Sequence, residues 1–243
     1  MGGVGGEDYY VPYLSQYFTI EALDSGTFTM AITNGASLNS VSYSTDDGES
    51  WVTTPISSGQ NINITTPTIQ QGGKVLWKCE TMNHALSAGY SQKAKFSSTA
   101  ACNIYGNIMS LIYNEGFVGK REVSSASYVF RELFMGLKVV DAKYMIIPIS
   151  TAYANCFHQL FYGNTYVVNA PTFIIETVDK NSMQEMFKNC SSLNNVTIVS
   201  DSVGTQANMF QGVTTNGVLY KDGNWSLTVP GTWTVQNVKF KPL

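Results

Sequence analysis

Residues able to perform acid–base or metal chemistry are few in this chain and stand far apart. The sequence holds two histidines, His84 and His158, which are separated by 74 residues. It contains none of the metal-binding patterns H-E-x-x-H, C-x-x-C or D-x-D-x-D-G, and no G-x-S-x-G turn that would present a nucleophilic serine. Two of the 17 acidic residues could still form a glycosidase pair, but their spacing favours no particular pair. We therefore expect a non-enzymatic protein that binds no metal or cofactor.

The two histidines differ in their expected surroundings. His84 belongs to the polar segment Met82-Asn-His-Ala, whereas His158 lies between Phe157 and Leu160. We expect His158 to occupy a solvent-facing position on a short helix.

One short stretch combines serine, aspartate and tryptophan in the order Ser44-Thr-Asp-Asp-Gly-Glu-Ser-Trp51. Its Asp-Gly pair supplies the positive φ that a tight hairpin requires, and the tryptophan resumes the strand. The stretch resembles the Asp-box hairpin of sialidase-type propellers and of several unrelated β-folds. Sialidase chemistry uses three arginines to hold a carboxylate, and this chain has two, Arg121 and Arg131. We therefore expect a structural hairpin in which Asp46 bonds its own turn backbone.

Charged side chains are scarce throughout the sequence. They make up 13% of the 243 residues, and the net charge is -3 at pH 7. With two arginines the chain has no basic stripe that could neutralise phosphates, which argues against nucleic acid as a partner. Ser, Thr, Asn and Gly must cover much of the surface, a composition that favours β structure and an extracellular or virion surface. We expect aromatic and amide groups, rather than charges, to make any binding contact.

No targeting or anchoring segment is recognisable in the sequence. Its start, Met1-Gly-Gly-Val-Gly-Gly-Glu-Asp8, lacks the basic and apolar regions of a secretion signal. No run of 18 apolar residues occurs, so we expect no membrane span. The four cysteines show no paired spacing and are expected to be small buried hydrophobic residues in a reducing compartment, rather than disulfides: Cys79, Cys102, Cys156 and Cys190.

Residues 1–15 are glycine-rich and then aromatic, with Tyr9, Tyr10 and Tyr13 close together. Such a segment cannot fold alone, but it can dock on a neighbouring protein in an extended form. We expect an N-terminal docking arm that uses these three tyrosines. The alternative is a frayed terminus that tethers nothing.

Residues 16–106 alternate apolar and polar side chains in short runs. Examples are Thr27-Phe-Thr-Met-Ala-Ile32, Ser40-Val-Ser-Tyr-Ser44 and Lys74-Val-Leu-Trp-Lys-Cys79. A period of two residues, broken by turn residues about every 8 to 12 positions, is typical of a β-sandwich. We therefore expect an Ig-like β-sandwich over 16–106.

Residues 107–222 contain a repeated motif of the form (L/M)-F-x-(G/N). It occurs as Leu133-Phe134-Met-Gly136, Leu160-Phe161-Tyr-Gly163, Met186-Phe187-Lys-Asn189 and Met209-Phe210-Gln-Gly212. The phenylalanines lie 27, 26 and 23 residues apart, and each of the first three follows an apolar residue four positions earlier. This spacing predicts a short helix in each unit, closed by a left-handed Gly or Asn. The expected core of the repeats consists of Phe134, Phe161, Phe187 and Phe210.

A short apolar run follows each of the first three motifs: Ile146-Ile-Pro148, Ile174-Ile175 and Val196-Thr-Ile198-Val199. A helix, a turn and a strand in each unit form the plan of a leucine-rich-repeat solenoid, in which no unit can bury its apolar face alone. We expect about four imperfect units over 107–222 and a C-terminal cap over 223–243. The predicted fold class is mainly β with short helices: an Ig-like β-sandwich followed by a short, degenerate leucine-rich-repeat solenoid.

The sequence resembles the leucine-rich-repeat surface proteins of gut bacteria, which recur in the phages that infect them. Asn189-Cys-Ser-Ser-Leu-Asn194, which follows Met186-Phe187, is similar to the family's MF-x-x-C-x-S-L signature, and Gly231-Thr-Trp-Thr-Val-Gln236 is similar to its C-terminal cap. The resemblance covers most of residues 17–240. The array is shorter than is usual in the family, and only the unit at Cys190 keeps the cysteine motif. These departures weaken the expectation of a broad concave ligand-binding face.

The resemblance and the composition together predict a non-enzymatic bacteriophage protein: a head fibre, decoration or adhesion protein on the virion exterior, assembled in the cytoplasm of the bacterial host. The expected partners are other virion proteins and a host-surface glycan or protein. We also expect a homo-oligomer, either a trimer or a dimer, because multiple copies would supply avidity. Two alternatives remain open: a bacterial cell-surface adhesin of the same repeat family, and the carbohydrate-binding module of a glycan-active enzyme.

Overall fold

Most of the regular structure in this chain is β-strand. The computed structural model describes residues 11–125 and 128–239. Within these ranges the helical elements are α1 (Val11–Leu14), α2 (Ser110–Tyr113) and the 3-10 turn η1 (Asn114–Gly116). The prediction of a mainly β protein with short helices is confirmed. In the described part of the chain, no helix has both the length and the apolar composition that a membrane crossing requires.

The first seven strands form an antiparallel unit. They are β1 (Phe18–Ala22), β2 (Phe28–Thr33), β3 (Leu38–Ser44), β4 (Val52–Pro55), β5 (Ile62–Thr65), β6 (Lys74–Thr81) and β7 (Lys93–Asn107). The long strand β7 pairs with β2 through residues 93–98 and with β1 through residues 102–105. From β1 the pairing continues through β6 and β3 to β4, and from β2 it continues to β5. The unit therefore has two branches of sheet that diverge from β7.

Apolar side chains from both branches fill the space between them. In β2 the residues alternate between buried and more exposed positions, as the period of two predicted. Phe96 of β7 contacts Trp77 of β6 with ring centroids 5.1 Å apart, and Met30 of β2 lies beside Cys79 of β6. These four side chains are at most 1% exposed. Burial of apolar surface therefore holds the two branches together.

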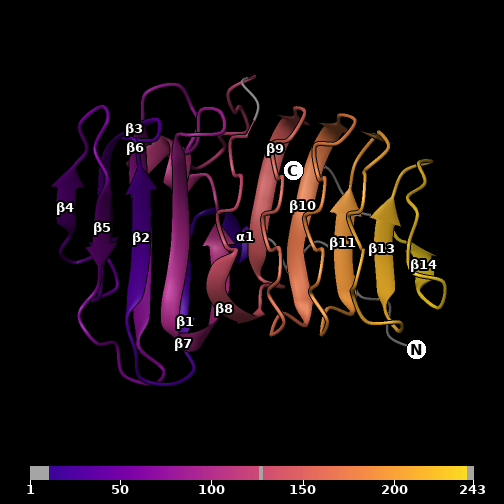
Figure 1. Ribbon diagram of the computed structural model, residues 1–243, viewed down its shortest axis with the longest axis horizontal. Coiled ribbons are helices and arrows are strands. Elements are labelled where there is room, and N and C mark those ends of the chain that lie inside the picture. Colours follow the sequence, from indigo (N-terminus) through magenta and orange to yellow (C-terminus); the bar gives the residue numbers. More distant parts are fainter. Residues whose placement is uncertain (1–10, 126–127, 240–243) are drawn as a thin grey trace.

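The second edge of β7 begins a parallel array. The strands of the array are β8 (Gly136–Asp141), β9 (Met145–Ala152), β10 (Asn169–Val178), β11 (Asn195–Val199), β12 (Ser202–Val203), β13 (Val218–Asp222) and β14 (Thr234–Asn237). β7 pairs with β8 and then with β9, and the sheet continues through β10, β11 and β13 to β14, all in parallel. Figure 1 shows these strands side by side. The predicted boundary between residues 106 and 107 falls at the end of β7, within this continuous sheet.

The (L/M)-F-x-(G/N) segments are not the short helices that their spacing predicted. Each is a series of tight turns, and in the second segment every fourth residue has a positive φ: Asn155 (60°), Gln159 (57°) and Gly163 (70°). Apolar residues spaced by four fall on one side of such turns, as they would on a helix. The expected left-handed Gly or Asn is confirmed in three of the four motifs, at Gly163, Asn189 and Gly212.

Backbone hydrogen bonding explains why the turns replace a helix. We call each unit of the array, a turn segment with the strand that follows it, a coil. The N–H of Leu160 donates to the carbonyl of Phe157 within the same turn, whereas the next N–H, that of Phe161, donates to the carbonyl of Met186 in the following coil. This alternation recurs from coil to coil. An α-helix would use its interior N–H groups internally, and would leave few of them for the neighbour. The turns therefore join adjacent coils on the side opposite the strands.

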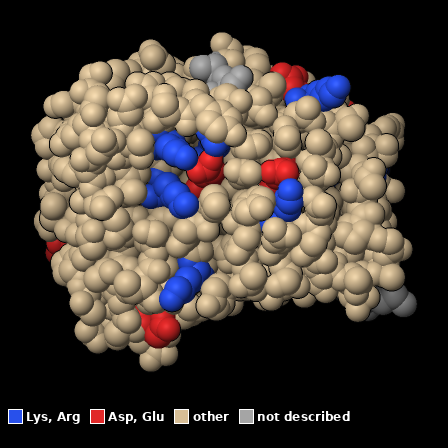
Figure 2. Space-filling view, in the orientation of Figure 1, with Lys and Arg blue, Asp and Glu red and all other residues tan. Residues whose placement is uncertain are grey.

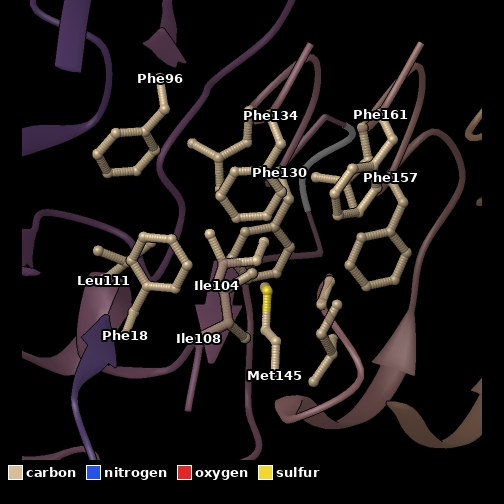
Figure 3. Close-up of a cluster of buried hydrophobic side chains, with 14 of the residues drawn as sticks. Phe18, Phe96, Ile104, Ile108, Leu111, Phe130, Phe134, Met145, Phe157 and Phe161 are labelled. Carbon is tan, nitrogen blue, oxygen red and sulfur yellow. The ribbon is translucent and has the colours of Figure 1, made fainter. Parts of the chain in front are cut away.

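The four motif phenylalanines form a continuous row of rings in the core. Phe134, Phe161, Phe187 and Phe210 contact one another in turn, with centroid distances of 5.2, 5.7 and 6.0 Å. At one end Phe134 contacts Phe18 and Phe96 of the antiparallel unit, and Figure 3 shows Phe134 between Phe96 and Phe161. At the other end Phe210 contacts Trp233. One apolar core thus runs through the antiparallel unit and the array.

Candidate binding site

The two histidines do not share a site. The ring of His84 packs on Tyr113 at 4.5 Å between centroids, and the ring of His158 lies against Tyr128 at 6.2 Å. The predicted solvent-facing position of His158 is wrong, because this residue is only 8% exposed. That prediction assumed a helix, whereas the observed turns place the His158 ring against Tyr128. Burial and the nearby Arg131 guanidinium lower the pKa of His158.

The Asp46 hairpin is structural, as predicted. The hydroxyl of Ser44 donates to Asp46 Oδ1 at 2.6 Å, and the backbone N–H of Ser50 donates to the same atom at 3.0 Å. The hydroxyl of Ser50 donates to Oδ2. These hydrogen bonds stabilise the carboxylate and lower the pKa of Asp46 to about 2. The carboxylate is therefore occupied in holding its own turn.

All four cysteines are free and buried, as expected of small hydrophobic residues: Cys79, Cys102, Cys156 and Cys190. Burial raises the pKa of each thiol, that of Cys190 to about 12. The thiols are therefore protonated at neutral pH and are poor nucleophiles. Within residues 11–125 and 128–239, no group of three or more His, Cys, Asp or Glu residues could hold a metal ion.

Of the three tyrosines expected in the docking arm, Tyr9 and Tyr10 lie outside the described residues. Tyr13 belongs to α1, which packs against β7 and β9. Its ring stacks on Tyr144 at 5.0 Å between centroids and meets Tyr105 edge to face at 6.4 Å. Tyr13 is thus packed on the chain's own sheet, at the place where the antiparallel unit meets the array.

A polar hollow lies beside Tyr13 on the outward face of the parallel sheet. Its volume is about 270 Å³. We call it the amide hollow, and its lining residues are Tyr13, Lys143, Tyr144, Asn169, Ala170, Thr172, Asn195, Thr197 and Tyr220. Most of these carry an amide or a hydroxyl group, and among the lining residues that the structure describes Lys143 is the only charged one. The sequence-based search for functional residues identified only Tyr13 of this set.

The strand alternation that builds the core also builds the amide hollow. Phe173, Ile198 and Leu219 are buried in the core, and the residues that precede or follow them along the strands point to the opposite face. The register places Thr172 opposite Thr197 and Thr197 opposite Tyr220. The three hydroxyl groups therefore form a row across β10, β11 and β13.

A ladder of side-chain hydrogen bonds fixes the amides of the hollow. Asn195 Nδ2 donates to Asn169 Oδ1 at 2.8 Å, and Asn169 Nδ2 donates to Asp141 Oδ2 at 3.1 Å. Asn195 Nδ2 also donates to Asn194 Oδ1. Because each amide is held by its neighbours, its orientation is set before any ligand arrives. The two asparagines are 26 residues apart, as are Phe161 and Phe187 of two successive motifs, and this recurrence is the sequence signal that could have identified them.

The chemistry of the amide hollow suits an uncharged polar ligand. Hydroxyl and amide groups can both donate and accept hydrogen bonds, and the tyrosine rings offer flat apolar surface. No two carboxylates face each other among the described residues that line it. Comparison of the chain with protein-family models, with curated proteins and with solved structures gave no match.

Proposed function

We propose that this protein is a non-enzymatic binding protein that recognises a carbohydrate through the amide hollow. The observation that carries the proposal is the hollow's lining of fixed amides, hydroxyls and tyrosines, in which Lys143 is the one charged side chain within residues 11–125 and 128–239. Sugars present many hydroxyl groups and one or more apolar ring faces, so they match both parts of this lining. A row of hydroxyls on three parallel strands forms a rigid surface, which lowers the entropy lost on binding.

The proposed fold assignment is an Ig-like β-sandwich followed by a leucine-rich-repeat solenoid. Two branches of sheet with a common core support the first part. Parallel strands linked by turn segments, with motif phenylalanines 27, 26 and 23 residues apart, support the second, because leucine-rich repeats are about 20–29 residues long. The turn segments take the place of the usual helix.

The proposed setting is the exterior of a bacteriophage particle, where the protein is a head fibre, decoration or adhesion protein held by its N-terminal arm. The resemblance to surface proteins of gut bacteria and their phages supports this setting. So does the scarcity of charge: Figure 2 shows a face that is mostly neutral, with Lys and Arg side chains next to Asp and Glu side chains in a few small groups. Several copies on one particle, as a dimer or trimer, would convert modest affinity at each site into avidity. Detection of the protein in purified particles, rather than in the bacterial envelope, tests this setting.

Binding to an array of neutral and acidic glycans tests the carbohydrate proposal. We expect neutral glycans to bind, and we expect Tyr220→Ala to weaken that binding about tenfold, or about 1.4 kcal/mol, because it removes one wall of the hollow. Tyr166→Ala is the matched control, since Tyr166 is 49% exposed and lies outside the lining. Equal losses in the two variants, or binding of no glycan by the intact protein, would overturn the proposal.

A further inference from the structure

A second hollow lies on the same face of the sheet, on the other side of Tyr13. Its volume is about 280 Å³, and its lining includes Gln16, Lys74 and Tyr105. We call it the sandwich hollow, because its walls come from β1, β6, β7, the segment after α1 and Asp47 of the hairpin between β3 and β4. Tyr13 contacts Tyr105 of the sandwich hollow and Tyr144 of the amide hollow. The two hollows therefore share a border of tyrosine rings.

Core packing shows that both hollows face the same way. In β1 and β6 the core residues are Phe18, Ile20, Val75 and Trp77, so Thr19 and Leu76, which line the sandwich hollow, point away from the core. In β10 and β11, Thr172 and Thr197 of the amide hollow likewise point away from the same core, because the next residues, Phe173 and Ile198, belong to it. Because one continuous sheet joins these strands, the two hollows open on one surface.

Strand register places the two hollows at neighbouring positions across five strands. Thr19 of β1 pairs with Tyr105 of β7, and the next residue of β7, Gly106, pairs with Met145 of β9. Ile146 of β9 pairs with Thr172 of β10, which pairs with Thr197 of β11. These residues form a row across the five strands, and its two halves are offset along the strand direction. Adjacent strands lie about 4.8 Å apart, so the row from β1 to β11 extends about 19 Å. The row is therefore longer than one sugar ring, and α1 crosses it between its two ends.

The volumes also favour joint use of the two hollows. Pockets that hold small molecules have volumes of about 300–1,000 Å³. Each hollow alone falls just below that range, at about 270 and 280 Å³, whereas the pair lies well within it. The tyrosine border between them offers ring edges and faces, which suit the apolar faces of a sugar chain that passes from one hollow to the other.

We propose that the two hollows are subsites of one groove, and that its ligand is an extended oligosaccharide rather than a single sugar or a terminal residue. This inference rests on the proposed function, because it assumes that the amide hollow binds sugar. The groove crosses the strands from the antiparallel unit to the parallel array. An oligosaccharide that fills both subsites gains binding free energy from the second subsite without a second loss of translational freedom. Its affinity should therefore rise with its length until both subsites are filled.

Calorimetric titration with oligosaccharides of graded length tests the inference. The probes are malto-, manno- and N-acetylchito-oligosaccharides, each from the monosaccharide to the octasaccharide. In the series that binds, we expect the longest members to bind about tenfold or more tightly than the disaccharide, with a plateau once the chain spans the row. The intact protein is used throughout.

A double variant separates the two subsites. Gln16→Ala combined with Lys74→Ala alters two exposed residues of the sandwich hollow and should abolish the gain with length, while the disaccharide affinity stays unchanged. The matched control is Gln71→Ala combined with Lys180→Ala, which replaces exposed residues outside both linings and should change neither quantity. Melting temperatures of both double variants verify that they fold.

The outcomes distinguish this inference from the function on which it rests. If no series binds, both the proposed function and the groove are wrong. If short and long chains bind equally, or if the gain with length survives the Gln16/Lys74 double variant, the groove is wrong and the amide hollow remains a carbohydrate site.

Discussion

At His158, burial and charge act on the same side chain, and the larger effect opposes protonation. Burial and Arg131 lower its pKa, whereas Glu185 and Glu132 raise it to a smaller extent. His158 Nδ1 is buried and has no hydrogen-bond partner. Protonation would therefore place charge on a buried ring whose Nδ1 has no hydrogen-bond partner, and the two carboxylates offset only part of that cost.

The stability of the protein should consequently depend on pH below the ordinary pKa of histidine. Because the folded-state pKa of His158 lies below 6.5, the unfolded chain takes up the proton first, and stability should fall as pH decreases from about 6.5 through the folded-state value. Thermal melting from pH 8 to pH 5 measures this effect. In His158→Gln the part of the decrease in melting temperature that comes from this imidazole should disappear, whereas His84→Gln should retain it. An identical pH profile for His158→Gln and the intact protein would contradict the assignment.

The sequence alone predicted the role of a residue where its side chain interacts within its own segment. The role of Asp46 followed from the Asp-Gly turn beside it, and the burial of the cysteines followed from their lack of pairing. Thr172, Thr197 and Tyr220 could not be singled out in this way. Each is an ordinary polar residue in its strand, and only the register of three strands brings the hydroxyls together.

Among the elements, the turn segments depend most on backbone conformation. Left-handed residues recur at Asn155, Gln159, Asn181 and Glu185, where φ lies between 53° and 60°. Asparagine adopts this conformation more readily than most residues, whereas a β-branched residue does so at a high cost. The hydrophobic spacing was the same for a helix and for these turns, so the sequence predicted the location of each element correctly and its conformation wrongly.

Substitution at one left-handed position tests this account of the turns. Asn155→Gly should leave the free energy of unfolding unchanged or raise it slightly, because glycine adopts a positive φ without strain. Asn155→Val should lower it by about 1–2 kcal/mol. Denaturant unfolding measures both changes. Asn224→Val is the control, since Asn224 is exposed and does not have a positive φ. An Asn155→Val variant as stable as this control would mean that the turn conformation is wrong.

In the whole molecule, the antiparallel unit and the array share a strand and a core. β7 pairs with β1 and β2 on one edge and with β8 and β9 on the other. The aromatic row crosses the same junction at Phe134. The change from period two to the repeated motif predicted the order of the two parts along the chain. It could not predict their continuity, because the pairing of β7 with β8 joins segments about 40 residues apart, and no local pattern specifies that contact.

We expect the two parts to unfold together. Phe134→Ala removes a fully buried ring at the junction and should lower the free energy of unfolding by about 3–5 kcal/mol. Hydrogen exchange by the amides of β6 and β11, on either side of the junction, should accelerate by the same factor, because both report one global opening. Acceleration confined to one side would show that the parts unfold separately.

The alternating hydrogen bonds of the turns give the array a modular length. Each coil presents one set of N–H donors to its successor and one set of carbonyl acceptors to its predecessor. For example, the N–H of Phe130 donates to the carbonyl of Cys156, and the N–H of Phe157 donates to the carbonyl of Ser182. An additional internal coil, such as a duplicate of residues 155–180, would find matching bonding groups on both sides. It would also add another strand to the outward face. Lineages that gain or lose a coil could therefore alter the width of their recognition surface without redesigning either end of the molecule.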